Sequence, residues 1–381
     1  MNISRASWSK ASGWVQQIEP LPNNMRADLV FAFGATGLMK DPAVLAEIRG
    51  LHPKAYVCGC STAGEIAGER VSDDSLVVTA VKFEETKIRA AETTVKDAGE
   101  SFAAGQRLAK SIPGENLAHV FVLSDGLSVN GSELVQGITS GLPGGVAITG
   151  GLAGDGSRFA ETLVCANGVC AAKQIALVGF YGEKIKVGYG SMGGWDPFGP
   201  ERRVTRSKNN VLYELDGRSA LDLYKEYLGE HAAGLPASGL LFPLSVRRDD
   251  SEESLVRTIL AVNEKNQSLT FAGDMPEGSL ARLMRANFDR LVDGANSAAR
   301  KCRKLSSAGG AELAILISCV GRKLVLKQRI EEEVEAAMEV LGPTVAATGF
   351  YSYGEISPFS PEGRCALHNQ TMTITTFAEA A

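Results

Sequence analysis

The chain has 381 residues, of which 44% are hydrophobic and 22% charged, and its formal net charge is −5. These proportions are ordinary for a globular protein and exclude a chain that is disordered throughout. The acidic balance, with only short basic runs that lie beside acids, argues against nucleic acid as a partner.

Three further features bear on the compartment. No apolar run approaches the ~20 residues of a membrane-spanning helix, so we expect no membrane span. The amino-terminal stretch is polar and lacks the apolar core of a signal peptide. The seven cysteines are an odd number and lie mostly in apolar contexts, which favours reduced thiols over a disulfide framework. We therefore expect a cytoplasmic protein.

A strand–helix–strand pattern recurs along the chain, at residues 28–65, 119–155 and 312–355. Each copy runs as an apolar strand, an amphipathic helix and a second apolar strand that ends in a glycine-rich turn and an acid. Strands that are apolar throughout are typical of buried parallel strands, whose carboxyl-terminal loops gather at one ligand-binding edge. The first and third copies align without a gap, whereas the middle copy is one residue shorter and carries Asp155 in place of glutamate.

Antiparallel strands and further helices are expected between these units. The patterns predict a hairpin over 75–83 and 86–94, a hairpin turn at 207–210, a short helix over 219–227 and a long amphipathic helix over 278–300. The predicted fold class is α/β, with mixed sheets in two pseudo-repeated halves built from β-α-β units with interspersed antiparallel hairpins. The glycine-rich turns of the two halves are expected to approach each other.

Several motifs follow one another in an order that resembles the FIST family. They are CGCSTAGEI, GGLAGDG, GWDPFGPERRVTRSKNNVLYELDGRSALDLYKEYLG, GDMPEG and GFYSYGEI, with HNQTMT after the last. The resemblance implies an N-terminal extension over 1–24, a FIST N-terminal domain over 25–217, a FIST C-terminal domain over 218–370 and a tail over 371–381.

The resemblance to FIST also implies a cytoplasmic sensory domain for small ligands. Members are fused to, or encoded beside, signalling outputs such as histidine kinases and diguanylate cyclases. Amino acids have been proposed as ligands, and some stand-alone bacterial members are reported to bind haem and sense nitric oxide. No output-domain motif occurs in this sequence, so we expect signalling through a separate partner, a histidine kinase or a cyclic-di-GMP enzyme.

The glycine-rich turns supply the candidate ligand-binding residues. The carboxylates of Glu65, Glu355 and Asp155 either accept hydrogen bonds from a ligand amine or cap the amides of their own loops. Glycine permits positive φ and a close approach of the backbone to a ligand. The other candidates are small, hydroxyl-bearing or amide-bearing residues of the same region: Cys60, Ser61, Thr62, Gly64, Gly151, Tyr351, Tyr353, Gly354 and Asn369.

If the ligand is haem b, with nitric oxide as its signal, His368 and His231 are the candidate axial ligands. A lone histidine near a strand is also often a hydrogen-bonded structural residue, and tyrosine or cysteine can ligate haem as well. These choices stay open at the level of the sequence.

No nucleophile, base and oxyanion site come together in the sequence, so a non-catalytic sensor is expected. The segment GYGSMG at 188–193 satisfies G-x-G-x-x-G, but GWDPFGP follows it and cannot begin a helix. The alternatives are an enzyme that uses Cys60 or a carboxylate pair, an amino-acid sensor without haem, and a scaffold without a small ligand.

Overall fold

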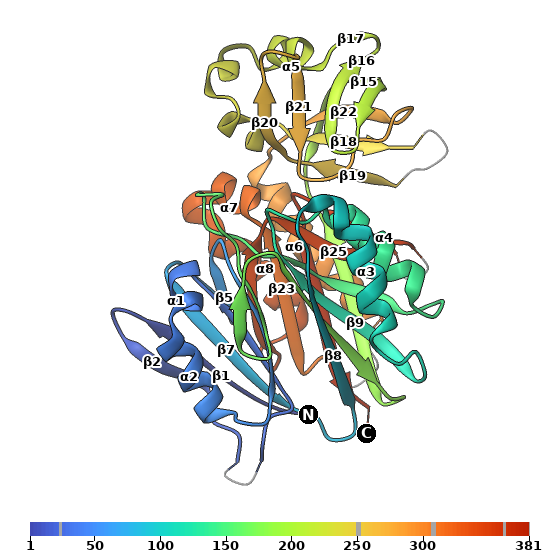
Figure 1. The fold of residues 1–381 in the computed structure, drawn as a ribbon. Helices are drawn as coiled ribbons and strands as arrows, with labels where there is room; N and C mark the ends of the chain where they lie inside the picture. Colours follow the sequence, from blue (N-terminus) through green and yellow to red (C-terminus); the bar gives the residue numbers. More distant parts are fainter. Residues whose placement is uncertain (23–24, 249–252, 306–309, 361–362, 381) are drawn as a thin grey trace.

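The computed structural model describes residues 1–381 except 23–24, 249–252, 306–309, 361–362 and 381. It is a mixed α/β structure, about 26% helix and 43% strand, which confirms the predicted fold class. A larger body contains three mixed sheets, and a smaller body with a fourth sheet caps one end of it (Figure 1). Both chain termini lie at the opposite end of the larger body.

Each repeated segment forms a parallel strand pair that helices connect. The pairs are β3 (Leu29–Gly34) with β4 (Tyr56–Ser61), β9 (Leu117–Ser124) with β10 (Ala147–Leu152), and β23 (Leu313–Cys319) with β24 (Ala346–Ser352). The connecting helices are α1 (Thr36–Lys40) and α2 (Pro42–Leu51), α4 (Gly131–Gly141), and α7 (Val320–Leu326), η4 (Lys327–Arg329) and α8 (Ile330–Leu341). The six strands are buried along nearly their whole length, as their continuous apolar runs predict.

The strand that follows each unit crosses to the sheet of another unit. After β4, β5 (Glu65–Ala67) pairs with β24; after β24, β25 (Gly354–Pro358) pairs with β10; and after β10, β11 (Val164–Ala166) pairs with β4. The three units thus exchange strands in a closed ring. The weaker middle copy is therefore the structural equivalent of the other two.

The remaining strands of the larger body extend these sheets. The first sheet has the order β12-β11-β4-β3-β7-β1-β2, with β1 (Asn2–Ser9), β2 (Gly13–Ile18), β7 (Ser75–Lys82) and β12 (Val169–Ala171). The second has the order β26-β25-β10-β9-β13-β8, with β8 (Lys87–Thr94), β13 (Gln174–Tyr181) and β26 (Cys365–His368). The third has the order β14-β27-β23-β24-β5-β6, with β6 (Arg70–Ser72), β14 (Ile185–Met192) and β27 (Met372–Glu379).

Two more helices cover the sheets of the larger body. The helix α3 (Ser101–Lys110), preceded by η1 (Ala98–Glu100), packs on α4, and α6 (Phe288–Leu305) packs on α8 and β14. Within the described residues, no helix is both long and apolar enough to cross a membrane.

The smaller body spans β15 to β22 and has its own apolar core, which includes Leu221, Tyr224 and Phe271. Its strands are β15 (Asp196–Lys208), β16 (Val211–Leu215), β17 (Arg218–Ser219), β18 (Leu244–Arg247), β19 (Ser254–Arg257), β20 (Ile259–Asn263), β21 (Ser268–Phe271) and β22 (Leu280–Arg285). Its helices are α5 (Ala220–Leu228), η2 (Gly229–Gly234) and η3 (Ala237–Leu241). The predicted turn at 207–210 and helix at 219–227 are both present.

The predicted domain bounds do not coincide with the two bodies of the structure. The segments 1–24 and 371–381, expected to be an extension and a tail, contribute β1, β2 and β27 to the central sheets. The boundary at 217/218 falls inside the smaller body, between β16 and β17. A domain boundary taken from sequence order misses these pairings because the partners of β1 and β27 are distant in the chain.

Two predicted elements differ from those in the structure, one in its pairing and one in where it begins. β7 and β8 do not form a hairpin: β7 pairs with β1 and β3, and β8 pairs with β13 in another sheet. The helix predicted over 278–300 begins only at Phe288, because residues 280–285 form the strand β22, which pairs with β15 and β18. Strand pairing overrides the local helix pattern there.

The expectation of reduced cysteines fails for one pair. Cys165 and Cys170 are directly opposite on β11 and β12 and form a disulfide. The other five cysteines are free thiols.

Candidate functional site

The three glycine-rich turns, at residues 58–65, 150–156 and 349–355, meet in a shared cluster that we call the turn hub. The Ala63 amide donates to the Tyr351 carbonyl (2.8 Å), and the Tyr351 amide donates to the Gly64 carbonyl (2.8 Å). The Gly154 amide donates to the Ser61 carbonyl (2.9 Å). The backbones of all three turns are therefore bonded to one another, and the expected approach of the turns is observed.

Three glycines hold equivalent positions in the last strands of the units: Gly59, Gly150 and Gly349. A methyl group at these positions would lie 2.1, 1.8 and 1.8 Å from a carbonyl oxygen of the neighbouring strand, that of Ala32, Val122 and Leu316 respectively. No real side chain fits at such distances. These glycines are therefore explained by packing within the sheets, without a ligand.

Glu65 lies at the end of the first turn and is 1% exposed. Its Oε2 accepts hydrogen bonds from the Ser75 amide (3.1 Å) and hydroxyl (2.6 Å), and its Oε1 accepts one from the Thr62 hydroxyl. Burial raises the pKa of Glu65 to about 7, although these hydrogen bonds oppose the shift. The carboxyl group thus holds the turn against the start of β7.

Glu355 has the same arrangement at the end of the third turn. Its Oε2 accepts from the Thr371 amide (3.2 Å) and hydroxyl (2.9 Å), and its Oε1 accepts from the Ser352 hydroxyl (2.5 Å). Burial raises the pKa of Glu355 to about 8. Both carboxyl groups thus make loop-capping hydrogen bonds, which is one of the two roles that the sequence left open.

These two raised pKa values predict a stability that falls at neutral and mildly alkaline pH. The folded chain retains protons that the unfolded chain releases above the ordinary pKa of 4.5. This contribution to stability is complete below pH 4.5 and is lost as the pH rises through about 7 and about 8. Glu355→Gln, which cannot ionise, should remove roughly half of the fall in melting temperature between pH 5 and 9. A fall in Glu355→Gln as steep as in the unmodified chain would contradict the shift.

Asp155 plays a different part in the middle turn. Its carboxylate accepts hydrogen bonds from the Thr36 hydroxyl (2.7 Å), from Arg158 Nε (2.9 Å) and from the amides of Ala160 (3.3 Å) and Glu161 (3.2 Å). Burial alone would raise the pKa of Asp155, but these hydrogen bonds together lower it. Asp155 is therefore an anionic anchor for the loop after β10.

The other residues predicted from the turns are mostly enclosed in the hub. Ser61 donates to the Gly154 carbonyl (2.8 Å), and Tyr351 donates to Glu333 (2.8 Å). Burial raises the pKa of Cys60 well above its ordinary value, so it is a neutral thiol. Gly64 has a φ of 134°. Thr62, Gly151, Gly354 and Asn369 are also buried. The side-chain amide group of Asn369 has no hydrogen-bond partner among the described residues.

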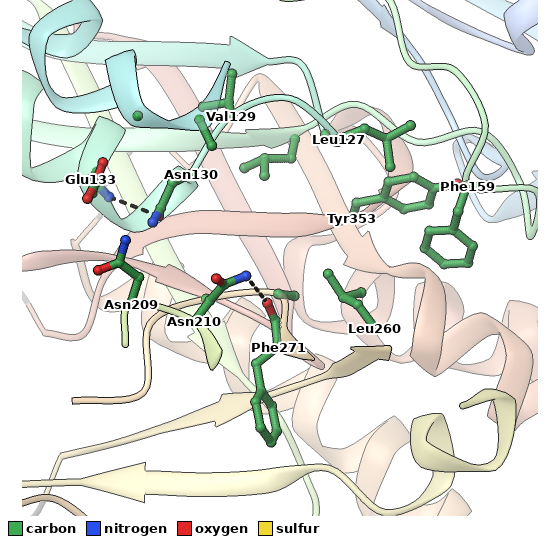
Figure 2. Close-up of a pocket in the computed structure, with 16 residues that line it drawn as sticks. Leu127, Val129, Asn130, Glu133, Phe159, Asn209, Asn210, Leu260, Phe271 and Tyr353 are labelled. Atoms are coloured by element: carbon green, nitrogen blue, oxygen red, sulfur yellow. Dashed lines mark hydrogen bonds between the residues drawn. The ribbon is translucent and has the colours of Figure 1, made fainter. Parts of the chain in front are cut away.

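A cavity of about 210 Å³ lies where the smaller body meets the hub side of the larger body. The larger body contributes the loop after β9, the start of α4 and Tyr353, and the smaller body contributes the turn between β15 and β16 and the segment at the end of β21. Figure 2 shows a polar end with Glu133, Asn130, Asn209 and Asn210, and an apolar end with Leu127, Phe159, Tyr353 and Leu260. Among the residues predicted from the sequence, Tyr353 lines this cavity.

Hydrogen bonds and ring contacts fix both ends of the cavity. Asn130 caps α4 by accepting from the amides of Ser132 (3.0 Å) and Glu133 (3.2 Å), and its Nδ2 donates to Asp274 Oδ1 (3.0 Å) across the junction. At the apolar end, the Phe159 and Tyr353 rings stack with centroids 4.4 Å apart. The cavity therefore has preformed polar and aromatic walls from both bodies.

Two family models match consecutive stretches of the chain: the FIST N domain over residues 28–218 and the FIST C domain over residues 220–358. The chain belongs to the FIST family. FIST domains are small-ligand-binding sensory domains, which supports a sensory role.

Individual relatives of this FIST chain are distant. An uncharacterized protein of Methanocaldococcus jannaschii is 27% identical over 205 residues, covering 50% of this chain and 38% of its own length. This chain thus matches well under half of that relative. A crystal structure of cyanuric acid hydrolase from A. caulinodans covers 93% of this chain and 91% of its own, with a TM-score of 0.32 and 10% identity, which is too remote to bear on function.

The two histidines predicted as haem ligands lie apart from the FIST cavity. His368 is buried in the larger body, where Nε2 is 2.9 Å from the Ser357 carbonyl, and burial lowers its pKa to about 4. His231 is exposed in η2 of the smaller body. Among the described residues, no three histidine, cysteine, aspartate or glutamate side chains form a group that could hold a metal ion.

Most residues that line the cavity were missed by sequence reasoning. The loop SDGLSVN after β9 carries a usable signal, because it follows the carboxyl end of a buried parallel strand, as the predicted turns do. Asn209 and Asn210 stand in a predicted hairpin turn, and only the three-dimensional fold brings that turn to the larger body.

Proposed function

We propose that this FIST protein is a small-ligand sensor of the cytoplasm whose ligand occupies the cavity between the two bodies. The observation that carries the proposal is that both bodies line the same cavity. A ligand there contacts the two bodies at once, so it favours one arrangement of the bodies over others. The output is a separately encoded signalling protein of the histidine kinase or cyclic-di-GMP enzyme type.

The covalent connections between the bodies support this mechanism. The chain passes between the bodies twice, through residues 193–195 and through Ala286 and Asn287. The first connection is tied to the larger body, since Trp195 Nε1 donates to the Gln370 carbonyl (2.9 Å) and Arg322 donates to the Gly193 carbonyl. Gln370 adjoins Thr371, which Glu355 holds in the hub. These contacts form a route by which a shift of the smaller body would reach the hub.

Haem b does not fit the cavity as the structure has it. Among the described residues, the lining contains no histidine, cysteine or methionine. The Tyr353 hydroxyl is engaged with the Gly156 carbonyl (3.1 Å) and the Phe159 amide (3.3 Å). A cavity of ~150 Å³ holds benzene, so about 210 Å³ is far too small for a macrocycle. A Soret band that persists through desalting after haem loading would overturn this assessment and restore haem and nitric oxide as ligand and signal.

The enzyme alternative has little support in the described residues. Cys60 is a buried thiol with a raised pKa, whereas a nucleophilic cysteine needs a thiolate. Glu65 and Glu355 each have their carboxyl oxygens engaged in their own caps.

The site assignment predicts that Ala98→Trp abolishes ligand binding. Ala98 is an exposed residue of η1 that lines the cavity, so an indole there fills the cavity without removing a core contact. Native mass spectrometry of the protein purified from its own host should show a bound small molecule in the unmodified chain and none in Ala98→Trp. The control Leu51→Trp, at a 64% exposed position of α2, should keep the molecule. Retention by Ala98→Trp would place the site elsewhere.

A further inference from the structure

The cavity lining carries negative charge and no positive charge among the described residues. None of the sixteen described residues that line the cavity is lysine, arginine or histidine, and one of them, Glu133, carries a carboxylate. That carboxylate has no hydrogen bond or ion pair in the described part of the chain, and its pKa is raised by burial and by the nearby Asp274. An unpaired carboxylate of this kind favours a cation beside it.

Arg257 lies close to this end of the cavity, and its guanidinium group is already engaged. Arg257 is 3% exposed, and it donates through Nε to the Asp274 carbonyl (3.1 Å) and through Nη1 to the Leu367 carbonyl (2.9 Å). It lies behind Gly273, where a Cβ atom would be 2.8 Å from its Cζ. The nearby Asp274 carboxylate stabilises this charge, and no ion pair joins Arg257 to Glu133 among the described residues.

Several backbone donors that an anionic ligand group would need in the same region are already engaged. At the start of α4, Asn130 Oδ1 already accepts hydrogen bonds from the backbone amides of Ser132 and Glu133. In the loop before it, the amides of Leu127 and Ser128 donate to Asp125. The helix terminus is thus closed to a carboxylate or phosphate, although such termini commonly bind anions.

The other end of the cavity suits an apolar body. Leu127 is 42%, Phe159 38% and Leu260 44% exposed, and these three surround the stacked Tyr353 ring. Figure 2 shows these side chains at the end away from Glu133. An aromatic ring with a short chain matches a cavity somewhat larger than one that holds benzene.

We infer that the cavity selects a small amine, with its ammonium group beside Glu133 and its apolar body against Phe159 and Leu260. The inference rests on the proposed function, because it names the chemical class of that site's ligand. An amino acid is disfavoured relative to the corresponding amine, since its carboxylate would enter a cavity without a cation. The discrimination comes from the uncompensated charge of Glu133.

Four probes with the same phenyl body separate these charges: 2-phenylethylamine, L-phenylalanine, 3-phenylpropionate and 2-phenylethanol. Isothermal titration of the full chain at pH 7.5 should show the amine binding about tenfold or more tighter than either carboxylate-bearing probe, which is about 1.4 kcal/mol. Glu133→Gln should weaken the amine by a similar factor and leave 2-phenylethanol unchanged. Glu69→Gln, at an exposed acid away from the cavity, should change neither.

The outcomes distinguish this inference from the proposed function. No binding of 2-phenylethylamine at millimolar concentration, equal or tighter binding of 3-phenylpropionate, or an unchanged amine affinity in Glu133→Gln overturns the amine assignment. The cavity itself is tested by Ala98→Trp: a native ligand that is lost in this variant but proves to be an anion leaves the site standing and overturns only the ligand class.

Discussion

Gly349→Ala is expected to prevent the chain from accumulating in its folded form. The added Cβ would lie 1.8 Å from the Leu316 carbonyl oxygen and 2.7 Å from its carbonyl carbon, and both are backbone atoms of the adjacent buried strand. Leu316 and Gly349 face each other in the parallel register of β23 and β24, so neither strand can withdraw without breaking the ladder. We expect a loss of at least about 3 kcal/mol in the free energy of unfolding.

The measurement is the yield of soluble protein together with the midpoint of urea unfolding. Gly50→Ala is the matched control, because nothing lies within 4 Å of a Cβ at that helical position in α2. There alanine should stabilise the chain by about 0.4–1 kcal/mol through its lower unfolded-state entropy. A Gly349→Ala variant that unfolds within about 1 kcal/mol of the unmodified chain would show that β23 and β24 do not pack as described.

The same glycines show why the turns were recognised in the sequence and why their role was left open. Gly59, Gly150 and Gly349 recur within the second apolar strand of each repeat, and that pattern is visible without a structure. A glycine needed for contact with a ligand and one needed for contact with a strand look identical in sequence, since both lack a Cβ. Only the carbonyl oxygens of the neighbouring strands decide between them.

The cavity was harder to predict than the hub for a topological reason. Its walls come from loops more than 100 residues apart in the chain, such as those of Asn130 and Gly273. Local periodicity contains no information on which strand edge the smaller body will cover. β22 is an example, because its residues fit a helical pattern until pairing with β15 and β18 is known. Tyr353 links the two regions, since it belongs to a recognised turn and also lines the cavity.

Arg322→Met is expected to destabilise the protein by about 3–5 kcal/mol, because it breaks a fully buried ion pair. Arg322 and Glu333 are both 0% exposed, with Arg322 Nε 2.9 Å and Nη2 2.7 Å from Glu333 Oε2. Methionine leaves the Glu333 carboxyl group with only the Ser318 (2.9 Å) and Tyr351 (2.8 Å) hydroxyls. The midpoint of urea unfolding measures the loss.

The double variant Arg322→Met, Glu333→Gln separates two costs. One is the cost of leaving the Glu333 charge buried without a partner, and the other is the cost of losing the other contacts of Arg322. The double variant retains an acceptor for Ser318 and Tyr351 but leaves no buried charge, so it should recover a large part of the stability lost in Arg322→Met. It should not recover the contact of Arg322 with the Leu291 carbonyl in α6, nor the contact with the Gly193 carbonyl, which holds the first connection to the smaller body. Limited proteolysis near residues 193–195 should therefore be faster in both variants than in the unmodified chain. Equal proteolysis in all three proteins would show that Arg322 stabilises the larger body without restraining the connection. The contacts between the cavity and the hub would then have to run through Trp195 and Gln370.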